Sequence, residues 1–138
     1  MMSNLGHRAM TGLRVGYAFA LFAINLYVAL ATFDMLPPLT PPTAESRAFL
    51  DALSAPSFFL PLLGATFLSG AAALLFQRTA PLGIALLAPP MAVIFLFHIF
   101  LTGMVVWGTL WAGPLAVLAW GHRDAFKALV SFQGPARF

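Results

Sequence analysis

Charged residues are scarce in this sequence, and that scarcity excludes most soluble folds. Of its 138 residues only 8% are Asp, Glu, Lys or Arg, whereas 61% are hydrophobic. A soluble domain usually carries about a quarter charged residues, because its exterior has to be covered with polar groups. Four acidic and seven basic residues cannot cover a domain of this length. We therefore expect lipid rather than water to be the main solvent.

Cysteine is absent altogether, which excludes disulfides, thiol relays, thiolate-bound metals and cysteine-ligated iron–sulfur clusters. The sequence also has no phosphate-binding loop and no metal-ligand cluster. Its formal net charge is +3 and its pI about 10.2. That basic balance does not indicate a nucleic-acid partner, because the basic residues are scattered singly beside apolar runs.

Four apolar segments are each about long enough to cross a membrane as helices, since roughly 30 Å of hydrocarbon takes about 20 helical residues. The third and fourth segments are predicted to meet in a tight turn at Thr102 and Gly103. Pro89 and Pro90 should kink the third helix. The kinked helix is either a bent packing element or one that opens a pocket. The predicted fold is therefore an all-α membrane protein, a single four-helix transmembrane bundle over residues 1–138. The predicted spans are about 13–33, 58–76, 81–101 and 104–121.

The positive charges predict the orientation, because Lys and Arg are retained on the cytoplasmic side of a membrane. With the N-terminus inside, only Arg47 of the seven cations lies outside, in the outer loop 34–57. We expect both termini, including the tail 122–138, to be cytoplasmic, and Arg14 to reach the inner headgroups. The cations on the cytoplasmic side are Arg8, Arg14, Arg78, Arg123, Lys127 and Arg137.

The outer loop is predicted to contain a short amphipathic helix. The Pro-rich stretch 37–42 cannot continue a helix, Thr43 is a suitable N-cap, and Pro56 marks the end. Helical spacing puts an apolar face opposite a polar one, so we expect the helix to lie on the outer membrane surface or to cap the bundle. The apolar face is Ala48, Phe49, Ala52 and Leu53, and the polar face Ser46, Arg47 and Asp51.

Small residues recur every four positions along three of the predicted spans. Lipid tails are as apolar as leucine, so helices in a membrane associate by close packing, and small residues mark the contact faces. We expect these rows to pack within the bundle or, alternatively, to contact a partner subunit. The rows are Gly12, Gly16 and Ala20; Ala65, Ser69 and Ala73; and Gly108, Ala112 and Ala116.

Polar side chains within the predicted spans are candidates for function, because they are costly to keep in hydrocarbon. His98 lies about one turn inside the outer interface, where it could meet Asp34 or Asn25 and bind a quinone carbonyl. It could also be the axial ligand of a haem iron or a chlorophyll magnesium. The alternative is a histidine satisfied by a loop carbonyl, a water or a neighbouring side chain.

Asn25 has two readings as well, since its amide can join two helices or face a ligand. His7 and His122 are expected to have solvated surface roles, although both face the cytoplasm and could approach each other. Asp and Glu are missing from all four predicted spans. Their absence argues against proton relays, cation transport and carboxylate-based catalysis.

Several short motifs follow one another in a characteristic order. They are Leu21–Asn25, then Ala48–Leu53 after the Pro-rich loop, Phe59–Leu62, Arg78–Leu82, Leu86–Pro90 and Leu96–Leu101. Taken together, over about residues 13–130, they resemble the DoxX-like family of four-helix bacterial membrane proteins. The resemblance implies the bacterial inner membrane and, as some members do, an association with quinone-linked or redox complexes.

One departure from the family pattern concerns the second span. The family usually has an acidic residue there, where this sequence has Gly64–Ser69. If that carboxylate carries chemistry in relatives, this chain lacks it. By contrast, Asn25 and His98 match the pattern, which keeps the hypothesis of a pocket on the outer side.

Two functions follow as hypotheses. The first is a non-catalytic accessory or scaffold subunit that contacts lipids and larger membrane partners, in an electron-transfer or photosynthetic complex. The second is a quinone- or small-ligand-binding component of a DoxX-like oxidoreductase, with His98 and Asn25 fixing the headgroup and Asp34 orienting the imidazole. No catalytic constellation, metal site or intrinsic cofactor is expected, so quinone, lipid, haem and chlorophyll enter only as contacts.

Overall fold

The computed structural model describes residues 4–130, and side chains for residues 6–127; Arg137 and the other tail residues beyond Val130 lie outside the described residues. Within this range every regular element is helical, which confirms the predicted all-α class. The elements are α1 (Asn4–Thr32), α2 (Ala44–Ser54), α3 (Phe59–Leu75), α4 (Ala80–Phe97), the π-helix η1 (His98–Thr102), α5 (Val105–Gly121) and α6 (Arg123–Val130).

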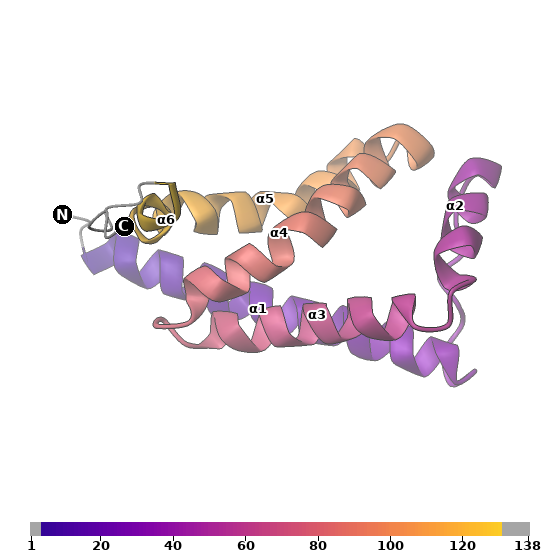
Figure 1. The fold of residues 1–138 in the computed structure, drawn as a ribbon, viewed down its shortest axis with the longest axis horizontal. Helices are drawn as coiled ribbons and strands as arrows, with labels where there is room; N and C mark the ends of the chain where they lie inside the picture. The colour runs from indigo at the N-terminus through magenta and orange to yellow at the C-terminus, as the bar shows by residue number, and fades with distance from the viewer. Residues whose placement is uncertain (1–3, 131–138) are drawn as a thin grey trace, which may run out of the picture.

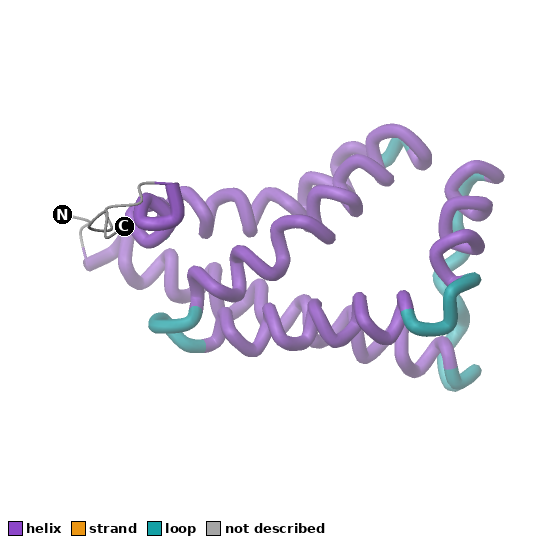
Figure 2. The backbone as a smooth tube through the Cα atoms, in the orientation of Figure 1, coloured by secondary structure: helices purple, strands orange, loops and turns teal. Residues whose placement is uncertain are grey.

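The four long helices are arranged in two pairs (Figures 1 and 2). Helix α1 packs on α3 and helix α4 on α5, and the pairs meet where α3 contacts α4 and α1 contacts α5. One end of the molecule, here called the α6 end, holds α6, the start of α1 and the α3–α4 turn. The opposite end, the α2 end, holds α2 and the turn between η1 and α5.

The core lies in the half of the molecule near the α6 end. Tight packing there depends on two glycines: a Cβ on Gly83 would lie 2.7 Å from the Gly70 carbonyl oxygen, and one on Gly70 would lie 2.5 Å from Leu87 Cγ. Helices α3 and α4 therefore approach until backbone meets backbone. The buried apolar side chains are Tyr17, Ala18, Leu21, Phe67, Ala71, Leu74, Ala80, Ile84, Leu87, Met91, Leu115 and Leu118.

Toward the α2 end the two pairs diverge (Figure 1). Beyond Met91 every residue of α4 is at least partly exposed, and in α5 the only buried residue before Leu115 is Gly108. Prolines lie at this transition, Pro89 and Pro90 in α4 and Pro114 in α5. A proline removes a backbone donor and crowds the preceding turn, so these positions favour bending. Helix α1 has no proline, and α3 has one only in its first turn, Pro61.

Local signals account for the connections. Gly103 takes the left-handed conformation (φ 70°) at the predicted turn before α5, a backbone geometry that glycine adopts without steric cost. Thr43 caps α2 as predicted, accepting a hydrogen bond from the Ser46 amide. The expectation that Ser46 belongs to a solvated face is wrong. Its side chain is fully buried, and its hydroxyl oxygen accepts a hydrogen bond from the Thr43 backbone N–H, which completes a capping box.

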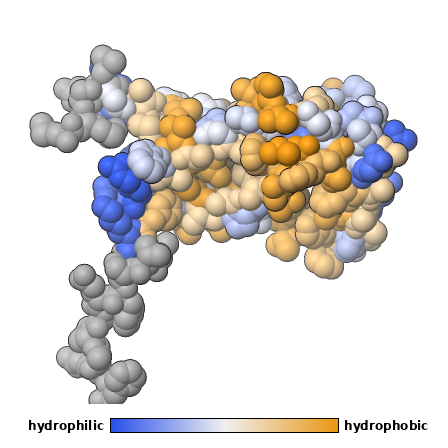
Figure 3. Space-filling model, turned by 90° about the horizontal axis from the view of Figure 1, so that it is seen from above, coloured by the Kyte–Doolittle hydropathy of each residue, from blue (hydrophilic) through white to orange (hydrophobic). Residues whose placement is uncertain are grey.

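Two described helices are long and apolar enough to cross a membrane by themselves, Gly6–Thr32 and Ala80–Thr102. A third candidate arises if α2 and α3, which meet at a bend of 92°, form one broken span; α5 is apolar but has 17 residues. The face in Figure 3 shows a largely apolar surface between ends where hydrophilic residues gather. Helix α1 begins before the predicted span 13–33, since residues 4–12 contain no proline to end a helix.

Candidate functional site

His98 lies at the α2 end, where α4 passes into η1. Its Nδ1 is 2.8 Å from the Ile94 carbonyl oxygen, and because a carbonyl only accepts, Nδ1 carries the proton. Its Nε2 carries the lone pair and makes no hydrogen bond within the part of the chain that the structure describes. The side chain is half-buried, edge-on to the Phe97 ring, and its Cβ lies close enough to α5 to require a glycine at position 108.

The structure does not join His98 to the two residues predicted to share its site. Asn25 donates its side-chain N–H to the Leu21 carbonyl oxygen within α1 (2.9 Å), and Asp34 is exposed in the left-handed conformation that ends α1. Among the described residues, hydrogen bonds and ion pairs between any two of Asn25, Asp34 and His98 are absent. A ligand site built from these three stays a prediction.

The small-residue rows are mostly not packed inside the bundle. In α1, Gly12, Gly16 and Ala20 are exposed, and a Cβ on either glycine would meet nothing within 4 Å. The expectation of packing within the chain is therefore wrong for this row. Small residues at every fourth position form one face of a helix, but the spacing does not say whether that face points into the bundle. In the structure this face of α1 points away from the core. Of the other rows, Ala65, Ser69 and Ala116 are exposed, Ala73 and Ala112 are half-buried, and Gly108 is buried.

The α1 row instead forms one side of an open apolar groove of about 450 Å³ between α1 and α5. Beneath it the Tyr17 hydroxyl donates to the Trp111 carbonyl oxygen (2.7 Å), which fixes the two helices relative to each other. The Trp107 and Trp111 rings meet edge to face, with centroids 6.4 Å apart. The groove is lined by Gly12, Leu13, Gly16, Tyr17, Ala20, Trp107, Leu110, Trp111 and Pro114.

Arg14 is buried rather than directed to headgroups, which corrects the expectation drawn from its charge. Its side chain is 5% exposed, and one terminal guanidinium nitrogen donates to the Leu74 carbonyl oxygen in the last turn of α3. A cation suits that position, because the C-terminal end of a helix carries partial negative charge and unpaired carbonyls. The Arg14 Nε has no hydrogen-bond partner among residues 4–130.

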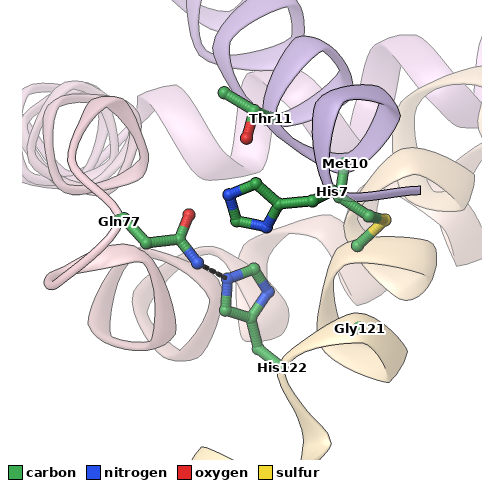
Figure 4. Close-up of a pocket in the computed structure, with 6 residues that line it drawn as sticks. All are labelled: His7, Met10, Thr11, Gln77, Gly121 and His122. Atoms are coloured by element: carbon green, nitrogen blue, oxygen red, sulfur yellow. Dashed lines mark hydrogen bonds between the residues drawn. The ribbon is translucent and has the colours of Figure 1, made fainter. Parts of the chain in front are cut away.

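At the α6 end, a pocket of about 140 Å³ lies between α1, the α3–α4 turn and the end of α5. His122 Nδ1 is 2.9 Å from the Leu118 carbonyl oxygen, so that nitrogen carries the proton and Nε2 faces the pocket. The Gln77 amide nitrogen lies 3.4 Å from Nε2, and His7 faces the same space from α1 (Figure 4). The lining residues are His7, Met10, Thr11, Gln77, Gly121 and His122.

Sequence reasoning missed this pocket. His7 and His122 were expected to have solvated surface roles, with an approach between them left open, and a pocket between the start of α1 and the end of α5 was not predicted. The available signal was that both histidines belong to the same predicted side of the membrane. Within the described residues, groups of three or more His, Cys, Asp or Glu able to hold a metal are absent.

Charges next to this pocket are exposed. The Lys127 ammonium, 2.6 Å from Asp124, lowers the pKa of that carboxyl below its usual value by hydrogen bonding and charge. The Arg123 guanidinium lies over the Trp120 ring, 5.4 Å from its centroid. Both contacts involve solvated groups, so they add little to stability.

Comparisons with protein-family models, curated proteins and solved structures find no match for this chain. The DoxX-like resemblance therefore stays an expectation from the order of motifs.

Proposed function

We propose that this chain is a small accessory subunit of a larger membrane complex and binds a partner's transmembrane helix in the groove between α1 and α5. The observation that carries the proposal is the exposed row of Gly12, Gly16 and Ala20. In membranes, such rows allow close approach of a second helix backbone. From the DoxX-like resemblance we infer that the larger complex is an electron-transfer or photosynthetic complex of the bacterial inner membrane.

The proposal includes four membrane-spanning helices, α1, α3, α4 with η1, and α5. Helices α3 and α5 have 17 residues each, and at 1.5 Å per residue each rises about 26 Å. That length is at the lower limit for a span, where local thinning of the bilayer compensates for the difference. Four spans put both termini on one side, and the distribution of Lys and Arg favours the cytoplasm.

A helix suits the groove better than a flexible chain would. The Tyr17–Trp111 hydrogen bond joins the two helices that form the groove, so the groove exists before a partner binds. One wall is a strip without projecting side chains, and the other carries Trp107, Trp111 and Leu110. A ridge of side chains on an incoming helix can enter between them, as helix packing generally requires.

The test is purification from native membranes in a mild detergent, comparing Gly16→Leu with Gly64→Leu. Gly64 also has no atom within 4 Å of an added Cβ, but it lies on α3 and does not line the groove. We expect the natural chain and Gly64→Leu to co-purify with the same partner chain, and Gly16→Leu to lose it while keeping its helical circular dichroism. Isolation of the natural chain as a lone bundle, or retention of the partner by Gly16→Leu, would contradict the proposal.

A quinone-binding role remains the alternative, favoured by one observation. Because Nδ1–H of His98 donates to the Ile94 carbonyl oxygen, Nε2 offers a lone pair at a half-buried position, which can accept a hydrogen bond from the hydroxyl of a reduced quinone. In that case His98→Ala abolishes binding of a quinone analogue by the purified protein while its melting temperature is unchanged. Equal binding by the natural chain and His98→Ala would remove this alternative.

A further inference from the structure

We propose that the pocket at the α6 end binds one divalent transition-metal ion through His7 and His122, with Gln77 and water completing the coordination. This site is separate from the α1–α5 groove and does not depend on a partner subunit. It uses residues from three parts of the chain that the fold brings together: the first turns of α1, the α3–α4 turn and the residue after α5.

His122 is held in the form that a metal requires. Its Nδ1–H donates to the Leu118 carbonyl oxygen at 2.9 Å, which fixes the tautomer and leaves a lone pair on Nε2. A hydrogen bond from the other ring nitrogen to a backbone carbonyl is usual for histidines that bind metals. The bond also fixes the ring plane, so Nε2 points toward Gln77 within the pocket (Figure 4).

Gln77 and His7 supply the remaining donors. The Gln77 amide nitrogen is 3.4 Å from His122 Nε2, a long contact that costs little to give up, and rotation of the amide turns its carbonyl oxygen toward a cation. His7 is exposed at the pocket's edge and is free to turn its ring toward His122. Met10 closes one wall, where the absence of a side chain on Gly121 makes room for its methyl group.

The donor set selects the class of ion. Two imidazoles with an amide oxygen suit Zn²⁺, Cu²⁺ and Ni²⁺, whereas Mg²⁺ and Ca²⁺ need several oxygen ligands and usually carboxylates. The six lining residues include no carboxylate. A volume of about 140 Å³ holds an ion with water ligands, since one water occupies about 30 Å³. Each of the three donor residues has an arginine next to it in the sequence: Arg8, Arg78 and Arg123. Their positive charge weakens the binding of a cation, so we expect the bound ion to exchange readily.

A bound ion would connect helix ends that are otherwise linked by few polar contacts. The described hydrogen bond across this pocket is the 3.4 Å contact between Gln77 and His122. Coordination by His7 and His122 would fasten the start of α1 to the end of α5, close to the point where α6 begins. Metal binding should therefore stabilise the fold by linkage.

The experiment uses the full chain without an affinity tag, in detergent, titrated with Zn²⁺ against a chromophoric competitor and with Cu²⁺ followed by electron paramagnetic resonance. We expect one ion per chain, nitrogen hyperfine coupling from two imidazoles, and a higher melting temperature with Zn²⁺. His7→Ala and His122→Ala should each weaken binding by at least about tenfold, as losses in metal shells usually do. His98→Ala, the third histidine, is the matched control and should bind like the natural chain.

His7→Ala is the decisive variant, because the exposed His7 side chain can be removed without disturbing the core, whereas His122 also caps α5. No binding by the natural chain, or binding that His7→Ala leaves unchanged, would overturn the proposal. Weakening by His98→Ala equal to that by His7→Ala would do so too. The proposed partner groove would be unaffected by any of these results.

Discussion

The two halves of this molecule are built from the same four helices but differ in how those helices meet. Near the α6 end, glycines let α3 and α4 touch backbone to backbone, and nearly all buried side chains gather there. Near the α2 end the helices are equally apolar but diverge, and α2 approaches both pairs through α3 and η1. The comparison shows that hydrophobic composition alone does not produce a core in so apolar a chain; close packing does.

Substitution at the helix contact should have the largest effect and test this comparison most directly. In Gly83→Ala, the new methyl group meets the Gly70 carbonyl oxygen and the Leu74 backbone, which cannot rotate away. We expect a loss of about 2–3 kcal/mol of unfolding free energy, as for other overpacked sites. Gly16→Ala, with open space at Cβ, should be neutral or up to about 1 kcal/mol more stable, because alanine favours helix. Denaturation in micelles, followed by circular dichroism, measures both.

Arg14 tests whether the packed half tolerates the loss of its buried cation. Arg14→Ala removes the hydrogen bond to the Leu74 carbonyl and leaves space beside the core. Hydrogen bonds from charged groups contribute about 1.5–3 kcal/mol, so we expect a loss of about 2 kcal/mol. Arg8→Ala, an exposed cation on the same helix, should change stability little. Equal melting temperatures for the two variants would show that Arg14 is not part of the core.

Tyr17 sharpens the comparison by isolating one hydroxyl. Tyr17→Phe loses the bond to the Trp111 carbonyl between α1 and α5, and we expect a cost of about 1 kcal/mol. Tyr27→Phe is the control near the α2 end, where the hydroxyl bonds the Pro37 carbonyl in an exposed position. That variant should cost less than about 0.5 kcal/mol, since water replaces an exposed bond. Thermal unfolding of both variants measures the two costs. A larger loss of stability for Tyr27→Phe than for Tyr17→Phe would contradict the placing of the packed half near the α6 end.

Thr43 should have the smallest effect on global stability and a local effect at the α2 end. Its hydroxyl donates to the Leu101 carbonyl (2.7 Å) and accepts from the Ser46 amide, so it both caps α2 and ties it to η1. Thr43→Ala should accelerate hydrogen exchange in α2 while leaving the core amides of α3 and α4 protected; the global cost should stay near 1 kcal/mol or below. Thr32→Ala, whose hydroxyl bonds within its own helix, is the control. Faster hydrogen exchange of the core amides in Thr43→Ala would contradict the view that the α2 end opens independently of the packed half.

The elements of the fold were predictable because local signals mark them. Proline and glycine limit the helices, Gly103 permits the turn before α5, and Thr43 begins α2. Which face of each helix packs was not predictable. Helices α4 and α5 are apolar all round, so no polar face marks their outward side, and the row at Gly12 and Gly16 has the same spacing as a true contact.

The candidate sites depended on contacts across long sequence separations. The predicted ligand site grouped Asn25, Asp34 and His98 by their expected depth in the membrane. Depth does not say toward which neighbouring helix each side chain points. Arg14 was assigned to headgroups by its charge, whereas the C-terminal carbonyls of α3 offered it a partner 60 residues away. The His7–His122 pocket likewise depends on which helices are neighbours, which one sequence does not reveal. Helix α6 was treated as tail because it follows the last apolar run.

If α4 and α5 cross a bilayer, as we propose, their prolines have a consequence for how the protein fits that bilayer. A rigid bundle meets a thinner or thicker membrane by tilting as a whole, whereas a pair of bendable helices can change its height on one side only. The packed half would then keep its shape while the diverging half follows the lipid. We expect the protein to remain folded across bilayers of differing acyl-chain length, with the adjustment taken up at Pro89, Pro90 and Pro114.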